Sequence, residues 1–127
     1  MISSKYRISK QHFPTILRNP SISGVYFRAV IAPSFSTDKP HFAVIISKKH
    51  AKLAVLRNLF RRTVYQIIQG YIDQLPIKSM VFIMQKTVQH EKSTQGRTQA
   101  VIEISKDINS IIGQVIKKYG KNTQGLI

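Results

Sequence analysis

The spacing of the apolar residues changes near Ser47, and this change limits what the chain can fold into more than any other feature. Residues 42–46 form a short apolar run that is typical of a strand buried on both faces. After this run the apolar residues recur at helical intervals of about 100°. One side of that helix would carry Leu56, Phe60, Val64, Ile67, Ile68 and Tyr71. The sequence therefore predicts a buried strand that leads into an amphipathic helix.

The opposite side of the expected helix is basic. It carries Arg57, Asn58, Arg61, Arg62 and Tyr65. The segment before the helix adds Lys48, Lys49 and Lys52. No Asp or Glu occurs from residue 39 to residue 70, and Arg57 and Arg61 stand four residues apart, where like charges weaken a helix. We therefore expect a polyanion to bind this segment and offset the repulsion.

The whole chain is basic as well. Its 127 residues include 20 Lys and Arg against 5 Asp and Glu, which gives a formal net charge of +15. A field of one sign raises the local concentration of phosphate-bearing partners. Because 43% of the residues are hydrophobic, the chain can still bury a core. We expect a single RNA-binding domain over residues 1–127, with frayed ends at 1–5 and 120–127.

The chain contains no cysteine, which excludes disulfides and thiolate metal sites. It also shows no signal-peptide core and no apolar run long enough to cross a bilayer. We therefore expect a cytoplasmic protein with no membrane partner. DNA is not an expected partner either, because the sequence shows neither a helix-turn-helix pattern nor dimerising heptads.

Elsewhere the pattern indicates a chain of the α+β class. A short helix is expected from Ser9 through Phe13, with Ile16 and Leu17 on its apolar side. We further expect strands at 25–32 and 80–84, polar loops at 34–40 and 85–96, and a final helix at about 99–119. Since the strands at 25–32 and 42–46 follow one another closely, we expect them to pair as an antiparallel hairpin.

The residues that could perform catalysis are dispersed. The carboxylates are Asp38, Asp73, Glu91, Glu103 and Asp107. Only Glu103 and Asp107 share a helical face, where we expect them to balance Lys106, whereas two-metal hydrolysis needs clustered carboxylates. A metal-free mechanism would need a pair of histidines, for which His12 and His41 are the best candidates. A surface or loop position is the more common role of such histidines, so we expect no catalytic residue and no metal site in the protein.

The basic segment also resembles a known family signature. Its residues Ser47-Lys48-Lys49, Lys52, Ala54-Val55, Arg57-Asn58 and Arg61-Arg62 match the pattern of the bacterial ribonuclease P protein subunit. The segment Arg7-Ile8-Ser9-Lys10, followed by Phe13, and the order of elements fit the same family. The chain differs at Leu59, where a basic residue is usual, and at Tyr65-Gln66, where Arg-Glu is common.

This resemblance implies a fold and a function. The fold is a compact α/β sandwich of the ribosomal protein S5 domain 2-like type, with a small mixed sheet of four strands and a left-handed strand-helix-strand crossover. The function is to assist a catalytic RNA subunit in removing the 5′ leader from precursor tRNA. The resemblance further implies that the chemistry resides in the RNA subunit and that Mg2+ acts through that RNA, so the protein alone holds no cofactor.

The resemblance also assigns roles to individual residues. Those implied to bind RNA are Lys48, Lys49, Lys52, Arg57, Asn58, Arg61 and Arg62, the three lysines lying near the rim of a cleft. Those implied to line this cleft, which holds the single-stranded leader, are Phe13, Leu17 and Val30. The alternative is a structural RNA-binding protein of the ribosomal type with no role in tRNA processing, which would share the charge and the α/β make-up.

Overall fold

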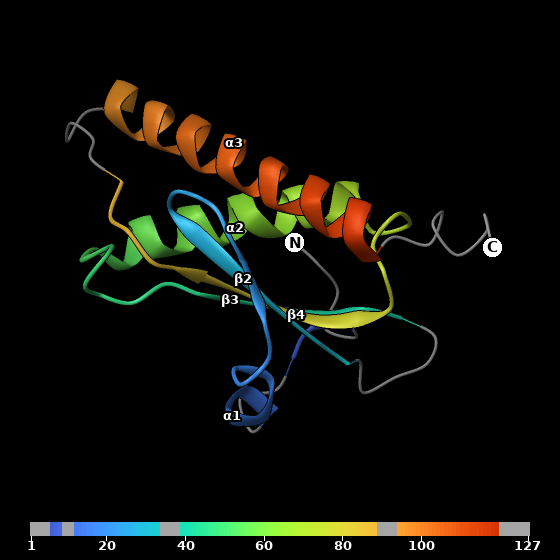
Figure 1. The fold of residues 1–127 in the computed structure, drawn as a ribbon. Helices are drawn as coiled ribbons and strands as arrows, with labels where there is room; N and C mark the ends of the chain where they lie inside the picture. Colours follow the sequence, from blue (N-terminus) through green and yellow to red (C-terminus); the bar gives the residue numbers. More distant parts are fainter. Residues whose placement is uncertain (1–5, 9–11, 34–38, 89–93, 120–127) are drawn as a thin grey trace.

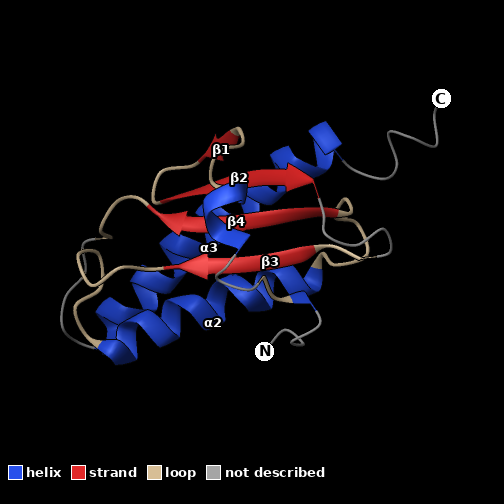
Figure 2. Cartoon of the chain, turned by 90° about the horizontal axis from the view of Figure 1, so that it is seen from below, coloured by secondary structure: helices blue, strands red, loops and turns tan. Residues whose placement is uncertain are grey.

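Four strands form one mixed sheet in the computed structural model, which describes residues 6–8, 12–33, 39–88 and 94–119. The strands are β1 Ser21–Ser23, β2 Phe27–Pro33, β3 His41–Ile45 and β4 Lys78–Met84. Their order is β1-β2-β4-β3; β2 is antiparallel to both β1 and β4, whereas β3 is parallel to β4. The α+β class with a small mixed sheet is therefore confirmed (Figure 2).

The predicted hairpin between residues 25–32 and 42–46 is wrong. Strand β4 lies between β2 and β3 and pairs with both. Ser79, Met80, Val81 and Phe82 are all buried, so this strand gains most from a central position. The pattern also missed β1, which is only three residues long and has exposed serines on either side of Ile22. The consecutive strands β1 and β2, and β3 and β4, do pair, but β2 and β3 do not, because β4 lies between them.

The connection from β3 to β4 runs through helix α2, Ala54–Gly70. In Figure 2 the two parallel strands point the same way, and α2 lies on the far side of the sheet. The chain therefore makes a left-handed crossover, the opposite hand to about 98% of such connections. The left-handed crossover that the resemblance implied is thus observed.

Helices cover the two faces of the sheet unequally. Helices α2 and α3, Thr94–Tyr119, pack over one face, and the short helix α1, Phe13–Ile16, lies on the other (Figure 1). The larger core, between the sheet and the two long helices, includes Phe27, Phe42, Phe60, Phe82, Ile104 and Ile108. A smaller core beneath α1 consists of Ile8, Ile16, Val30, Ala32, Ala43 and Val81. Since α1 contacts only β2 and β4 among the strands, the described helices leave part of this face of the sheet uncovered.

Two helix boundaries differ from the prediction. Helix α1 is described from Phe13, with His12 at the N-cap; Ser9 and Lys10, where we expected the helix to begin, lie outside the described residues. Helix α3 begins at Thr94, about one turn before the predicted start. The first turns of α3 are polar, so the apolar spacing did not indicate a helix there. In the structure, Gly96 and Ala100 are buried one turn apart. Asp38, Glu91 and the chain ends 1–5 and 120–127 also lie outside the described residues.

Asp107 has a different role from the one that we expected. Its side chain is 7% exposed and faces the turn between β1 and β2 rather than Lys106, which is exposed. The carboxylate accepts hydrogen bonds from the backbone N–H groups of Val25, Tyr26 and Phe27, at 2.6, 2.9 and 2.9 Å. Asp107 therefore joins α3 to the start of β2. No helix among the described residues is apolar over a length that could cross a membrane.

Candidate RNA-binding site

The basic segment forms a turn and then the start of α2. The N–H groups of His50 and Ala51 both donate to the carbonyl of Ser47, each at 3.1 Å. This turn leaves the side chains of Lys48 and Lys49 exposed, and Lys52 is exposed just after it. Three lysines thus project from a hydrogen-bonded loop rather than from the helix itself.

Arg57 holds this loop against the helix. Its Nη1 atom donates to the backbone carbonyls of Ala51 and Lys52, both at 2.9 Å. A guanidinium group has five N–H donors, and these two bonds use only one of its nitrogens. Arg57 therefore stabilises the conformation of the loop, and its role is not limited to a contact with RNA.

The other polar residues of α2 divide between solvent and the sheet. Asn58 and Arg62 are exposed. Arg61 is half-buried, and its Nη1 atom donates to Asn58 Oδ1 at 3.2 Å. This bond orients Arg61 along the helix, on the side that faces β3. The predicted RNA-binding residues therefore differ in exposure, with Arg57 and Arg61 half-buried and the others exposed.

A pocket of about 540 Å³ lies beside β3. We call it the β3 pocket; it is lined by Arg7, Ile8, Phe13, Ala43, Val44, Ile45, Ile46, Arg61 and Tyr65. Three separate parts of the chain meet here, namely the segment before α1, the edge strand β3 and the middle of α2. The pocket combines two guanidinium groups with two aromatic rings, which is the mixture that unpaired nucleotides favour.

Tyr65 was expected among the arginines on the polar side of α2, but it is 6% exposed. The guanidinium carbon of Arg7 lies 5.7 Å from the centre of its ring. Burial raises the pKa of the Tyr65 hydroxyl above its usual value, although Arg7, a backbone hydrogen bond at Val44 and Arg61 act in the opposite direction. Sequence reasoning therefore missed Arg7 and Tyr65 as components of the site. The position of Arg7 in the N-terminal motif was the one available signal.

The open part of the sheet continues the β3 pocket. Arg28, Ile83 and Ile45 lie side by side on β2, β4 and β3, and all three are half-buried. The next row toward α1 consists of Val30, Val81 and Ala43, all of them buried. Sequence reasoning missed the half-buried row, because the row is formed only when β2, β4 and β3 are neighbours in the sheet.

The three residues assigned to the leader cleft occupy different environments. Phe13 lines the β3 pocket. Leu17, at the end of α1, is 39% exposed but does not line that pocket. Val30 is fully buried, so it supports the surface from beneath and cannot contact a bound strand directly. Of these three residues, Phe13 therefore lines the β3 pocket, and Val30 packs beneath the surface.

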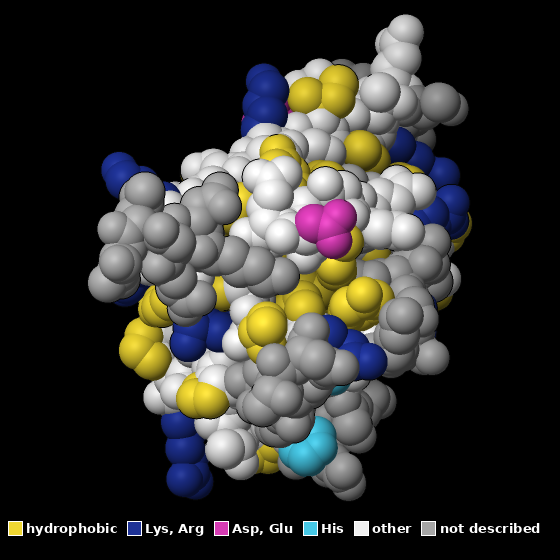
Figure 3. All heavy atoms as spheres, turned by 90° about the vertical axis from the view of Figure 1, so that its right-hand side faces the viewer, with side chains coloured by type: hydrophobic (Ala, Val, Ile, Leu, Met, Phe, Trp, Pro, Cys, Tyr) yellow, Lys and Arg dark blue, Asp and Glu magenta, His cyan; other side chains and the backbone are white. Residues whose placement is uncertain are grey.

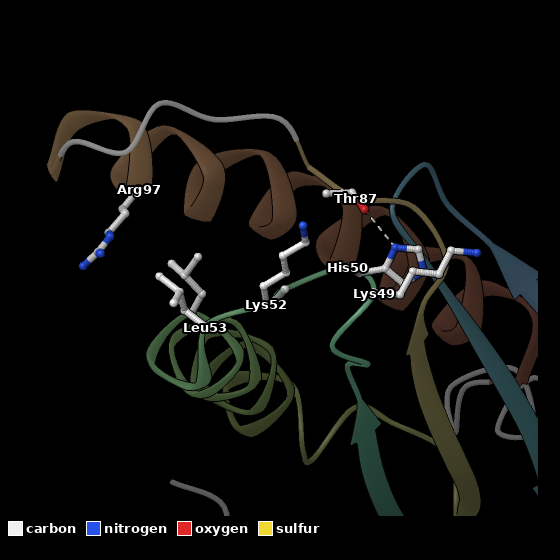
Figure 4. A pocket seen from close by; sticks show the side chains of 8 residues that line it. Lys49, His50, Lys52, Leu53, Thr87 and Arg97 are labelled. Carbon is white, nitrogen blue, oxygen red and sulfur yellow. Dashed lines mark hydrogen bonds between the residues drawn. The ribbon is translucent and has the colours of Figure 1, made fainter.

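Two of the three loop lysines, Lys49 and Lys52, line a second pocket. This α2–α3 pocket has a volume of about 440 Å³ and is lined by Lys49, His50, Ala51, Lys52, Leu53, Leu56, Thr87 and Arg97. His50 Nδ1 lies 3.0 Å from Thr87 Oγ1, which fixes the ring at one edge (Figure 4). The two pockets share no lining residue. Lys49 and Lys52, which we expected with Lys48 near the rim of the cleft, thus line a different pocket from Phe13.

Positive charge extends beyond these pockets. Figure 3 shows the end of the molecule at which α2 and α3 end, with Lys and Arg side chains near its edges, hydrophobic side chains between them and little acidic surface. Among the described residues, no three His, Cys, Asp or Glu side chains are grouped so that they could hold a metal ion. This arrangement can bind a polyanion at several points, with the most defined geometry around α2.

Comparisons with known proteins agree with this geometry. The sequence profile of the Ribonuclease P family matches residues 3–108. The ribonuclease P protein components of Vibrio vulnificus and Vibrio campbellii are each 27% identical to this chain over 82 residues, which is 65% of this chain and 70% of theirs. The profile match, over residues 3–108, includes both the basic segment and the residues of the β3 pocket.

A solved structure shows the same fold. The structure of the Staphylococcus aureus RNase P protein superposes with a TM-score of 0.71, at 19% identity, and covers 87% of this chain and 97% of that one. A second structure of the S. aureus protein gives a TM-score of 0.67 at 18% identity, with coverage of 91% and 93%. The arrangement of the sheet and helices is thus the one found in those proteins.

Proposed function

The chain belongs to the Ribonuclease P family, and on that premise we propose that it is the protein subunit of a ribonucleoprotein that removes the 5′ leader from precursor tRNA. The subunit binds the catalytic RNA and the leader, and the RNA performs the chemistry. The observation that carries this proposal is the β3 pocket, where Arg7, Arg61, Phe13 and Tyr65 form a basic and aromatic surface beside the open part of the sheet.

We propose that the leader lies along this surface. Single strands bind to positively charged grooves in which bases stack on flat apolar groups. The ring of Phe13 and the half-buried row of Arg28, Ile83 and Ile45 supply apolar area and charge on one face of the sheet. A strand that enters past Arg7 or Arg61 would meet this face directly.

The catalytic RNA is the proposed partner of the exposed side of α2 and of the loop before it. Its phosphates would contact Lys48, Lys49, Lys52, Arg57, Asn58, Arg61 and Arg62. Arg61 lies between this surface and the β3 pocket, and it is therefore placed to contact either RNA. Neutralising phosphates with several cations releases counterions, so the affinity should fall steeply with salt.

We propose that Mg2+ is held by the RNA subunit. Two acids on α3 are already occupied: Asp107 accepts three backbone hydrogen bonds, and Glu103 Oε1 accepts one from Gln99 at 3.0 Å. The Lys and Arg side chains of the protein replace part of the ion atmosphere of the RNA. The protein is therefore expected to lower the concentration of Mg2+ that the RNA needs for cleavage.

Reconstitution tests the proposal. The purified protein is added to a bacterial catalytic RNA, and release of the 5′ leader from precursor tRNA is followed at low and high Mg2+. We expect no cleavage by the protein alone, slow cleavage by the RNA alone at low Mg2+, and rapid cleavage by both together. Cleavage by the protein without RNA, lost in His12→Ala or His41→Ala, would overturn the assignment of the chemistry to RNA.

The same assay separates the ribosomal-type alternative. A structural RNA-binding protein would bind the catalytic RNA without any preference for the leader. Affinities of the assembled complex for precursor and mature tRNA are therefore measured side by side. Equal affinities, together with no effect on the Mg2+ requirement, would contradict the proposed function.

A further inference from the structure

The α2–α3 pocket brings together cations from distant parts of the sequence. In Figure 4, Lys52 points from the segment before α2 toward α3, and Arg97 extends from α3 toward the start of α2. Lys49 lies at the opposite edge, beside His50. None of the described lining residues is acidic, so the part of the wall that the structure describes carries positive charge alone.

The same pocket has an apolar floor. Ala51, Leu53 and Leu56 line it, and Leu53 keeps 55% of its surface exposed. An isolated exposed leucine needs no explanation. An exposed leucine between Lys52 and Arg97 in a cavity of about 440 Å³ is different, because that volume lies within the range of about 300–1,000 Å³ typical of small-ligand sites.

The start of α2 adds to the attraction for an anion. Leu53 occupies the N-cap without a side-chain hydrogen bond to the helix, and the first turn contains no acidic residue. Free N–H groups and the helix dipole favour negative charge at such a terminus. This effect supports the site that the three cations and the apolar floor define.

From this geometry we propose that the α2–α3 pocket binds one unpaired nucleotide of the catalytic RNA. The base lies against Leu53 and Leu56, where the planar guanidinium of Arg97 can stack on it. The phosphate faces Lys52, while Lys49 adds positive charge at the far edge of the pocket. This inference rests on the proposed function, since it assigns a second and separate RNA contact to the same subunit, away from the surface proposed for the leader.

Two short RNA probes distinguish a nucleotide site from a general anion site. One is a single-stranded hexamer of adenylate, and the other is a hexamer of the same charge whose sugars lack bases. The methyl NMR signals of Leu53 and Leu56 are followed during titration of the full-length protein. We expect the adenylate hexamer to shift them and the abasic hexamer to leave them nearly unchanged. Equal shifts with both probes would indicate an anion site only and overturn the proposal.

Three variants test the site in the assembled enzyme. Because stacking of one base contributes about 1–3 kcal/mol, Leu53→Ala and Arg97→Ala should each weaken binding to the catalytic RNA about fivefold or more. The matched control is Lys117→Ala, which removes an exposed cation near the other end of α3 and should have a smaller effect. Circular dichroism verifies that each variant is folded.

The outcomes separate this inference from the proposed function. If Leu53→Ala and Arg97→Ala bind the catalytic RNA and support cleavage like the parent, the pocket proposal is wrong while the function stands. If the parent protein itself fails to assemble with any catalytic RNA, the proposed function is wrong and the pocket assignment falls with it.

Discussion

The side chain of Asp107 lies so close to Gly24 that the turn between β1 and β2 has no room for another atom. A Cβ atom placed on Gly24 would lie 2.8 Å from Asp107 Cγ. The carboxylate cannot withdraw easily, because the N–H groups of Val25, Tyr26 and Phe27 hold it in place. Asp107 thus requires a glycine at position 24, more than 80 residues away in the chain. The contact between them fixes the start of β2, the strand that carries Arg28.

Replacing the carboxylate should destabilise the fold. Asp107→Asn keeps the shape of the side chain but replaces one acceptor oxygen by an NH2 group. The side chain can then accept fewer than three of the backbone hydrogen bonds. We expect the free energy of unfolding to fall by about 1–3 kcal/mol, the usual range for leaving buried polar groups unsatisfied. Urea denaturation measures this change. The control is Glu103→Gln, on the same helix, which should alter stability by less than about 0.5 kcal/mol. Equal effects of the two substitutions would show that Asp107 has no special role.

Adding a methyl group to the turn should also be harmful. Gly24→Ala forces Asp107 or the backbone to move, and overpacking of this kind costs about 1–3 kcal/mol. Gly113→Ala is the matched control, because a Cβ atom there meets nothing within 4 Å. In the interior of α3 it should stabilise the protein by up to about 1 kcal/mol. The midpoint temperature of thermal unfolding should therefore fall for Gly24→Ala and rise for Gly113→Ala.

Arg57 and Arg61 should differ although both lie in the family motif. Arg57→Ala removes two hydrogen bonds to the loop carbonyls and should lower the free energy of unfolding by about 1–2 kcal/mol. Arg61→Ala should change stability by less than about 0.5 kcal/mol but weaken RNA binding by about 1–3 kcal/mol if its contact is bidentate. Urea denaturation and RNA titration together separate the two roles. The prediction fails if Arg57→Ala is as stable as the parent.

Tyr65 should make the fold sensitive to alkaline pH. Its pKa is raised by burial, so the folded state favours the neutral hydroxyl. Below about pH 10, the usual pKa of tyrosine, both states are neutral and this contribution to stability is fully present. As the pH rises further, Tyr65 loses its proton first in the unfolded state. Its contribution to the free energy of unfolding therefore decreases until the pH exceeds the pKa of Tyr65 in the folded state.

The variant Tyr65→Phe tests this pH dependence. Its free energy of unfolding should fall less steeply than that of the parent above about pH 10, because it has no proton to lose at this position. Tyr119→Phe, at the half-exposed end of α3, is the control for loss of a hydroxyl elsewhere. Parallel curves for the parent and Tyr65→Phe would contradict the burial argument.

Phe13 should act on the leader rather than on the catalytic RNA. Because its ring lines the β3 pocket, Phe13→Ala should reduce the preference for precursor over mature tRNA, with a loss of about 1–3 kcal/mol if one base stacks on it. Leu17→Ala, on the same short helix but outside the pocket, should have a smaller effect. An equal loss of affinity for both tRNAs would assign Phe13 to the small core beneath α1.

Much of the local structure could be predicted because hydrophobic spacing is a local property. The apolar side of α2 is buried at Leu56, Phe60, Val64 and Ile68 as the helical interval indicates. The core positions of α3, including Ile104, Ile108 and Ile111, follow from the same period. The basic side of α2 was also visible, since Lys and Arg remain exposed unless a partner is available.

Most helices and strands, the charge and the family signature could be predicted from the sequence, because neighbouring residues set helical and strand periods and the total charge is a sum. The strand order, the burial of Tyr65, the use of Arg57 within the loop and the division of the cations between two pockets could not be predicted in this way. These features depend on hydrogen bonds and packing between distant segments. Strand β4 pairs with both β2 and β3 although more than thirty residues separate it from β3, and Asp107 of α3 accepts hydrogen bonds from N–H groups at the start of β2. The spacing of apolar residues within a segment does not indicate which distant segment it will contact.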